Sequence, residues 1–524
     1  MQFPCESWWN NVNRRNRTQE FPHPFVHELK LTTTQRIRGT VMGAVLFPVR
    51  ITLATLCFLL VWPIAKLRMA GLGSEDRLRP VRGWRRWLVH EIVRLLSRGV
   101  FFAVGFLWVK VKGQRAGVAE APVLAVAPHS GFLDMLVLCL TDLATVVSRS
   151  ENTSLPVIGA LLEFNQAVLV NRKDPESRKK CVSQINERLT SKGYWPQMLM
   201  FPEGTTTNGR ALIKFKPGAF LAGVPVQPVL LHYPNRLDTM RWTWKGTSWV
   251  QSLWHTTSQF YTNMTIEFLP VYTPSQEEKE DPSLYADNVQ KLMAKGLGVP
   301  ATDYVMEGRF PVKHVGGLSL PLESPARETL KLLHHAGLST SQVQTALSRM
   351  TDQCQPGQEK AVSIDLLQQW LELSDRETAA KICSLFSKKD VSVDLRLICL
   401  SISTVSGLCS FEDLLDKAFK LYDSNGDGVL TAEELAGLMG ALVGSPQFHT
   451  AKIYTELTSR GPANKEELLN LLTKETTYQE LATVYLRPEG AEHEASSHHM
   501  ANGKDGNHNG IKRNGNMVAN KRED

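Results

Sequence analysis

Val-Leu-Ala-Val-Ala-Pro-His-Ser-Gly-Phe-Leu-Asp, residues 123–134, joins a strand-like run to a pair of polar side chains. The apolar residues 123–127 predict a strand, which the following proline ends. We expect His129 at the end of a sheet and Asp134 in the first turn of an apolar helix over residues 135–140. A carboxylate beside an imidazole fixes its tautomer and stabilises its protonated form, so the imidazole can take a proton from a hydroxyl group. The stretch therefore indicates a general base, His129, that Asp134 orients.

A second motif, Phe-Pro-Glu-Gly-Thr at residues 201–205, again follows an apolar run, which predicts a strand over residues 198–201. Six further stretches complete the pattern: residues 24–29, 155–172, 195–197, 215–220, 224–229 and 233–238. Together these motifs resemble the lysophosphatidylcholine acyltransferase family, within the glycerolipid acyltransferases, over roughly residues 24–310. The resemblance implies transfer of an acyl chain from acyl-CoA to the free hydroxyl of a lysophospholipid, as in phospholipid remodelling.

The resemblance also assigns roles to single residues. His129 acts as the base and Asp134 orients it, without an acyl-enzyme and without a catalytic metal. The acceptor is held by Glu203, Gly204 and Thr205, where Glu203 either orders the loop or pairs with Arg172. The basic residues expected to meet a substrate phosphate are Arg172, Lys214 and Lys216.

Two positions depart from the family pattern. Thr206 stands where the family commonly has cysteine, and Leu133 stands where it tends to have an aromatic residue. Both departures lie near the proposed pocket and bear on the preference for acyl chain and head group, not on the chemistry. The resemblance implies an acceptor of the lysophosphatidylcholine or lysophosphatidylethanolamine class, with donor chain length open. Alternatives are a lysophosphatidic acid acyltransferase, an acetyl-CoA:lyso-PAF acetyltransferase, and an inactive, calcium-dependent membrane adaptor. The adaptor predicts a lost catalytic residue, whereas His129 and Asp134 are both present.

Residues 423–434 match the calcium-binding loop of an EF-hand at each position. The expected ligands are Asp423, Asn425, Asp427, Val429 through its carbonyl, Thr431 and Glu434. Helices are predicted over residues 411–421 and 432–442. EF-hands work in pairs, but the expected upstream partner near residues 385–394 and the downstream stretch 458–464 are both short of ligands.

Residues 41–65 form a largely apolar segment that Pro48, Arg50 and Pro63 interrupt. Three interpretations remain open: a tilted transmembrane helix, a re-entrant hairpin broken near Pro48, and a buried helix of a soluble domain. Basic residues flank the segment on both sides, and such residues favour an anionic membrane surface by about 1 kcal/mol per charge. Membrane lipids are therefore expected partners, whereas no basic-aromatic motif indicates nucleic acid.

The predicted fold class is α/β: an acyltransferase domain with helices around a mixed sheet, an N-terminal membrane helix or hairpin, and a C-terminal all-α EF-hand region. The predicted domains are a disordered segment (1–30), a membrane-associating helical region (31–112), the catalytic domain (113–310), the EF-hand-like domain (320–485) and a disordered tail (486–524). Within the catalytic domain we predict further strands over residues 167–170, 226–231 and 265–271, and helices over residues 174–192 and 283–296.

The eight cysteines have no disulfide-framework spacing, which indicates reduced thiols in a cytosol-facing chain. The terminal Lys-Arg-Glu-Asp, residues 521–524, resembles a dibasic retrieval signal. We therefore expect the endoplasmic reticulum membrane, or the Golgi, with the catalytic domain and the C-terminus facing the cytosol. The sequence leaves the oligomeric state open.

Overall fold

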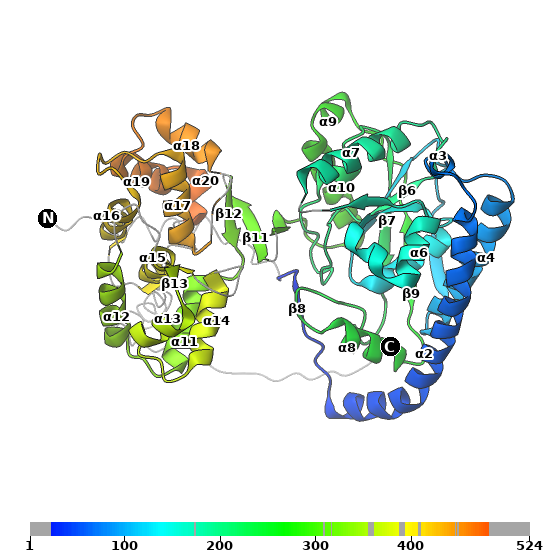
Figure 1. The fold of residues 1–524 in the computed structure, drawn as a ribbon, viewed down its shortest axis with the longest axis horizontal. Helices are drawn as coiled ribbons and strands as arrows, with labels where there is room; N and C mark the ends of the chain where they lie inside the picture. Colours follow the sequence, from blue (N-terminus) through cyan, green and yellow to red (C-terminus); the bar gives the residue numbers. More distant parts are fainter. Residues whose placement is uncertain are drawn as a thin grey trace, which may run out of the picture. The chain divides into compact units, whose positions relative to one another are not determined.

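A mixed sheet of seven strands forms the middle of the N-terminal half of the chain (Figure 1). In spatial order the strands are β2 (Val109–Lys112), β9 (Met264–Phe268), β7 (Val226–His232), β3 (Val123–Ala127), β6 (Met198–Met200), β4 (Thr145–Arg149) and β5 (Val168–Val170). β7 and β9 are antiparallel, and all other neighbours are parallel. The predicted α/β class with a mixed sheet is confirmed.

The structure is a computed structural model that describes residues 23–171, 174–307, 310–315, 317–354, 361–386, 393–406, 410–445, 447 and 450–481. It divides into two units, residues 1–311 and 312–524. The expectations that lie outside the described residues are those for residues 1–22 of the N-terminal segment, for Arg172, for the tail 486–524 and for its terminal Lys-Arg-Glu-Asp.

β3 is buried on both faces, which explains its uninterrupted apolar sequence. Leu124 and Val126 pack in a core with α4 (His90–Ala103) and α5 (Leu136–Leu140). Val123 and Ala127 belong to a second core with α7 (Pro175–Leu189) and α10 (Pro282–Leu297). The unit of residues 1–311 therefore has three layers, with helices on both faces of the sheet.

The predicted strands and helices coincide with β5, β6, β7, β9, α7 and α10 to within a few residues. Strands β2 and β4 were not predicted, and the sheet begins at Val109, four residues before the predicted start of the catalytic domain at residue 113. The remaining elements of this unit are α3 (Ser74–Arg77), the π-helix η1 (Arg85–Val89), the 3₁₀ turns η2 (Phe132–Met135), η3 (Ser150–Ser154) and η4 (Pro217–Ala219), α6 (Pro156–Phe164), α8 (Trp249–Thr257), α9 (Gln276–Glu280) and β10 (Tyr304–Glu307).

Residues 23–30 are ordered against the catalytic unit, so the predicted boundary of the disordered segment at residue 30 lies too far along the chain. β1 (Val26–His27) pairs in parallel with β8 (Lys245–Gly246), and Phe25 is fully buried. The side-chain amide of Asn208 donates to the carbonyls of His23 and Val26 at 2.8 and 2.9 Å. These long-range contacts have no local signature, which is why a polar, aperiodic segment was predicted to be disordered.

α2 (Thr33–Met69) is one continuous helix of 37 residues, about 55 Å long, so the predicted hairpin broken near Pro48 is wrong. α2 runs beside α4 along one edge of the unit (Figure 1). Its buried residues follow a helical stripe, namely Gly43, Arg50, Ala54, Val61, Ala65, Arg68 and Met69. The other sides of α2 expose large apolar side chains, among them Val41, Val45, Val49, Leu53, Leu56 and Leu59. Of the helices in the described ranges, α2 alone is long and apolar enough to cross a membrane.

Arg50, the charged residue in the middle of the apolar segment, is 9% exposed and caps the end of α8. Its guanidinium donates to the carbonyls of Thr257, Gln259 and Phe260 at 2.9, 2.5 and 2.6 Å. Burial lowers the pKa of Arg50 from its ordinary value. A charge that would be costly in lipid is thus bound by backbone carbonyls of the catalytic unit.

Substituting Arg50→Ala is expected to destabilise the packing of α2 on α8, because three backbone carbonyls lose a charged donor. We expect the free energy of unfolding to fall by about 2–4 kcal/mol. Thermal unfolding in detergent, together with limited proteolysis of α2, measures the effect. Arg38→Ala is the control, because Arg38 lies exposed on the same helix. Equal midpoints for both variants would contradict the role of Arg50.

The C-terminal unit contains a hairpin of β11 (Phe310–Val315) and β12 (Leu318–Pro321), and helices around one core. The helices are α11 (Pro325–His335), α12 (Thr340–Asp352), α13 (Ile364–Trp370), α14 (Arg376–Phe386), α15 (Leu395–Ser406), α16 (Phe411–Tyr422), α17 (Ala432–Val443), α18 (Ala451–Thr458), α19 (Lys465–Lys474) and α20 (Thr476–Glu480). The two helices predicted around the calcium loop are confirmed as α16 and α17. The hairpin and the short ladder β13 (Ala361–Val362) with β14 (Val393–Asp394) qualify the all-α expectation.

Candidate active site and calcium loop

The proposed catalytic residues meet where three neighbouring strands end. β3, β6 and β7 are parallel, so their carboxyl ends lie at the same edge of the sheet. His129 follows β3, Glu203 follows β6 and Tyr233 follows β7. The carboxyl edge of such a sheet is where ligands bind in open α/β folds.

His129 and Asp134 form a hydrogen-bonded pair, with 2.7 Å between Nδ1 and Oδ2. Asp134 lies in the 3₁₀ turn η2, just before α5, and is fully buried, whereas the His129 side chain is 18% exposed. Nδ1 must carry a proton to donate to the carboxylate, so the lone pair of the neutral ring is on Nε2. In the described part of the chain, Nε2 has no hydrogen-bond partner. The ring stacks on Phe201 at a centroid distance of 4.1 Å.

Asp134 is held by donors that the local motif alone does not reveal. The backbone N–H groups of Ser130 and Gly131 donate to Oδ2 at 2.6 and 2.9 Å, and the Tyr233 hydroxyl donates to Oδ1. Burial, together with the neighbouring carboxylate, raises the pKa of Tyr233 well above its ordinary value, so the phenol remains a donor. Tyr233 was not among the predicted site residues. Its signals were its place two residues after the predicted strand 226–231 and at the start of the stretch 233–238.

Glu203 is 1% exposed and orders the catalytic loop, which favours the first of the two roles considered for it. Its Oε1 accepts the backbone N–H of His129 at 2.7 Å, and its Oε2 accepts the hydroxyl of Thr207 at 2.9 Å. The backbone N–H of Thr207 returns to the His129 carbonyl at 2.7 Å. Glu203 therefore positions the backbone that carries the imidazole. Thr207 was not predicted, because nothing in the sequence marks its partner.

Burial raises the pKa of Glu203 from 4.5 to about 7, although the hydrogen bonds from His129 and Thr207 oppose the shift. Between these two values the folded chain holds a proton that the unfolded chain releases. The free energy of unfolding therefore falls as pH rises through this window and levels off above it.

In Glu203→Gln this contribution is absent, so the variant should gain stability relative to the parent between about pH 5 and about pH 8, by up to about 3 kcal/mol. Thermal unfolding of both proteins in detergent at each pH measures the gain. Glu120→Gln, at an exposed turn, is the control. A difference between parent and Glu203→Gln that stays constant with pH would contradict the buried, titrating carboxyl.

The other predicted substrate-binding residues are placed unevenly. Gly204 has φ +65°, and a β-carbon there would lie 3.1–3.5 Å from the Lys216 side chain, so Lys216 lies over the loop. Thr205 is half-buried beside them. Lys214 instead forms an ion pair with Asp287 of α10 at 3.4 Å. Lys216 is thus brought to the Glu-Gly-Thr loop, whereas Lys214 is engaged by a helix.

The predicted calcium loop between α16 and α17 has the expected turn geometry. Gly428, at its sixth position, has φ +75°. Asp423 accepts the N–H groups of Gly426 and Gly428, both at 2.8 Å. Burial alone would raise the pKa of Glu434, but hydrogen bonds from Thr431 and Ser424 outweigh it and lower the pKa to about 2. All six predicted ligands offer oxygen, which suits calcium, yet no three acidic, His or Cys side chains in the described residues converge as a ready metal cluster.

The calcium loop pairs with the downstream loop, not with the upstream one that was expected. Leu430 N–H donates to the carbonyl of Ala463 at 3.0 Å, which joins this loop to the connection between α18 and α19. The upstream stretch pairs through β14 with β13 instead. Both stretches, 385–394 and 458–464, lack calcium ligands, so the sequence did not show which of them pairs with the calcium loop.

Comparison with known proteins decides the family. The Acyltransferase family model matches residues 108–232, and the EF hand domain model matches residues 414–442. Lysophospholipid acyltransferase LPCAT4 of Mus musculus is 44% identical, covering 92% of this chain and 92% of its own length. The chain belongs to the lysophospholipid acyltransferase family. Within this family, the stretches 24–29, 195–197 and 233–238 and the calcium loop are most similar to the type-4 member.

Lysophosphatidylcholine acyltransferase 2 of Homo sapiens, another relative, is 37% identical over 89% of this chain and 85% of its own length. The crystal structure of the 1-acyl-sn-glycerophosphate (LPA) acyltransferase PlsC from Thermotoga maritima is similar with a TM-score of 0.34 and 14% identity, over 50% of this chain and 96% of that chain. As a lysophospholipid acyltransferase family member, the chain is an acyltransferase enzyme with an EF-hand domain.

Proposed function

We propose that this chain transfers an acyl group from acyl-CoA to the free hydroxyl of a membrane lysophospholipid. The observation that carries the proposal is the His129–Asp134 pair, in which Nδ1 is bound to the carboxylate and Nε2 remains available as a base. The acceptor class is taken from the relatives, which are named lysophospholipid and lysophosphatidylcholine acyltransferases.

In the proposed reaction, Nε2 of His129 takes the proton of the acceptor hydroxyl as its oxygen attacks the thioester carbonyl carbon. Asp134 stabilises the imidazolium that forms. The tetrahedral intermediate then collapses, the carbon–sulfur bond breaks, and the departing thiolate of CoA takes the proton from the imidazolium. Base and proton balance are restored, and the proposed cycle uses neither a catalytic metal nor an acyl-enzyme.

Acyl transfer by membranes that contain this chain tests the proposal directly. Labelled acyl-CoAs of several chain lengths, including acetyl-CoA, are offered with lysophospholipids that carry different head groups and with lysophosphatidic acid. Transfer to a choline or ethanolamine lysolipid is the expected result. Transfer only to lysophosphatidic acid, or only from acetyl-CoA, would replace it by one of the two neighbouring activities. No transfer to any acceptor would favour the remaining alternative, an inactive, calcium-dependent membrane adaptor.

Membrane attachment is proposed to occur through the outer surface of α2 and α4 and not through a free-standing span. Arg50 binds α2 to the end of α8, so the middle of α2 cannot reach the centre of a bilayer without the catalytic unit. Trp84 just before η1, Trp87 in η1 and Phe102 in α4 are exposed as well, and both elements contact α2. Tryptophan beside arginine suits a membrane interface. An endoplasmic reticulum membrane, with the chain on its cytosolic side, fits the reduced thiols of the described cysteines.

Calcium is proposed to bind the loop 423–434 through Asp423, Asn425, Asp427, the Val429 carbonyl, Thr431 and Glu434. Glu434 would exchange its hydrogen bonds from Ser424 and Thr431 for the ion. Bound calcium would brace α16 against α17.

Glu434→Ala is expected to weaken calcium binding by at least about 100-fold, because the loop loses its bidentate carboxylate. Isothermal titration of calcium into the purified full chain measures the affinity. Glu433→Ala is the matched control, since Glu433 is an exposed neighbour on the same helix turn. Unchanged calcium affinity in Glu434→Ala would show that this residue is not a ligand.

A further inference from the structure

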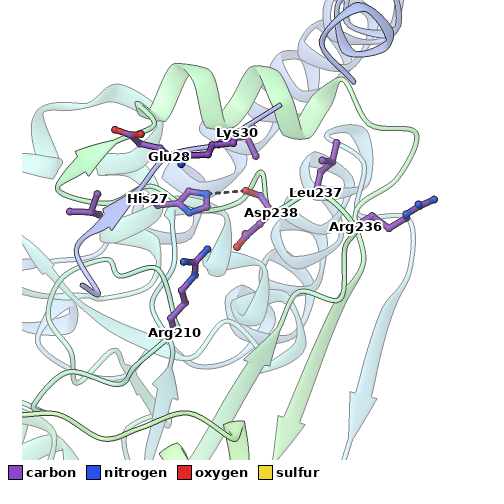
Figure 2. Close-up of a pocket in the computed structure, with 9 residues that line it drawn as sticks. His27, Glu28, Lys30, Arg210, Arg236, Leu237 and Asp238 are labelled. Atoms are coloured by element: carbon purple, nitrogen blue, oxygen red, sulfur yellow. Dashed lines mark hydrogen bonds between the residues drawn. The ribbon is translucent and has the colours of Figure 1, made fainter. Parts of the chain in front are cut away.

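A pocket of about 490 Å³ lies at Arg210, seven residues after Glu203. It is formed by three segments that are distant in the sequence: residues 26–30, Arg210 and residues 236–238. Figure 2 shows Arg210 extending from its loop towards His27 and Asp238. The volume is within the usual range for small-molecule sites, roughly 300–1,000 Å³.

The charges of the pocket favour an anion. Lys30, Arg210 and Arg236 line it, and within the described residues none of the three forms an ion pair. One of the two acidic residues is already compensated, because Asp238 binds the Nε of Arg241. The carboxylate of the other, Glu28, and the guanidinium of Arg236 both point away from Arg210 (Figure 2). Arg210 is thus the cation that faces His27 and Asp238. Uncompensated cations around a cavity indicate a phosphate or carboxylate ligand.

Hydrogen bonds between its segments preform the pocket. His27 is 7% exposed, and its Nε2 lies 3.0 Å from the carbonyl oxygen of Asp238, to which it donates (Figure 2). Asn208, two residues before Arg210, accepts the backbone N–H of Arg210 at 3.0 Å while its amide group binds residues 23–26. Little ordering is therefore needed when a ligand binds.

The segment from Glu203 to Arg210 connects the pocket to His129, the proposed base. Thr207, which binds both Glu203 and the His129 carbonyl, precedes Arg210 by three residues, at most about 10 Å of backbone. Gly209 lies against Pro128, because a β-carbon there would be 3.1 Å from the proline ring. One substrate molecule is therefore long enough to extend from the pocket to His129.

We infer that the pocket at Arg210 binds a phosphate group of a substrate during acyl transfer, either the phosphodiester of the lysophospholipid or a phosphate of the CoA moiety. The inference rests on the proposed function. It is distinct from the phosphate contacts expected of Arg172, Lys214 and Lys216, which belong to other segments. Arg210 is a binding residue in this assignment and takes no part in proton transfer.

Initial rates of Arg210→Gln and Lys30→Gln, measured while each substrate is varied in turn, test the inference. We expect KM for one substrate to rise about tenfold in Arg210→Gln and less in Lys30→Gln, with kcat within about twofold of the parent. A rise for the lysophospholipid assigns its phosphodiester. A rise for acyl-CoA that disappears with the 3′-dephospho thioester assigns the 3′-phosphate, and one that persists assigns the pyrophosphate.

Arg178→Gln is the matched control, because Arg178 is exposed on α7, outside the pocket, and should leave both KM values unchanged. Arg210 is itself exposed, so Arg210→Gln should unfold at the parent's temperature. Unchanged KM values for both substrates in Arg210→Gln, or a loss confined to kcat, would overturn the inference. If the parent transfers no acyl group, calorimetry with inorganic pyrophosphate replaces the assay: binding that Arg210→Gln loses supports the pocket, and no binding to the parent overturns it.

Discussion

His129→Ala is expected to lower kcat by about 10²–10⁴-fold, which is the usual contribution of a positioned general base. An acceptor hydroxyl is a weak nucleophile until its proton is removed, and Nε2 of His129 is the base that the geometry leaves available. KM for either substrate should change little, because the imidazole acts on the proton transferred in the transition state.

The variant keeps the backbone contacts that order this loop. The N–H of residue 129 still donates to Glu203, and its carbonyl still accepts from Thr207. Loss of the stacking contact with Phe201 is the main structural cost. Equal abundance in membranes and an equal midpoint of thermal unfolding would establish that the loss is chemical. A correctly folded His129→Ala that acylates lysolipids at the parent's rate would remove His129 from the mechanism.

Asp134→Asn is expected to lower kcat by roughly 10²–10⁴-fold, as replacement of the orienting carboxylate does in Ser-His-Asp triads. Asp134 accepts hydrogen bonds from His129, from two backbone N–H groups and from Tyr233. An amide can preserve much of this network, but it carries no charge to stabilise the imidazolium. The charge, more than the shape, should therefore determine the loss.

Tyr233→Phe is the matched comparison for Asp134→Asn, because it removes one donor to Asp134 and leaves the carboxylate ionised. Its rate should fall by about tenfold. Initial rates of both variants in the same membranes measure the two effects. If Tyr233→Phe lost as much activity as Asp134→Asn, the position of the carboxylate would matter more than its charge.

The predicted site residues that the structure brings together are close in sequence. His129 and Asp134 are joined by one short turn after β3, so their pairing follows from local chain geometry. The calcium loop and its flanking helices follow from the same kind of signal, a fixed spacing of oxygen ligands and glycine. β3, β6, β7 and β9 were recognisable from apolar runs, because buried strands carry apolar side chains on both faces.

The parts that were missed are contacts between distant segments. Tyr233 meets Asp134 across 99 residues of chain, and Arg50 meets Phe260 across 210. In the sequence, Arg50 and Pro48 read as interruptions of an apolar segment, and the continuous α2 could be seen only with α8 beside it. Lys214 and Lys216 looked equivalent, yet only Lys216 lies over Gly204.

The α/β class and the calcium-loop motif can be predicted from the order and spacing of residues alone, because each depends on short segments whose geometry is local. The acyltransferase activity was implied by the resemblance of the ordered motifs to a known family. The hydrogen-bond partners of Asp134, the burial of Glu203, the course of α2 and the cationic pocket at Arg210 depend on which segments the sheet brings together. Such contacts are set by the packing of distant residues, and that packing leaves no periodicity or spacing in the sequence.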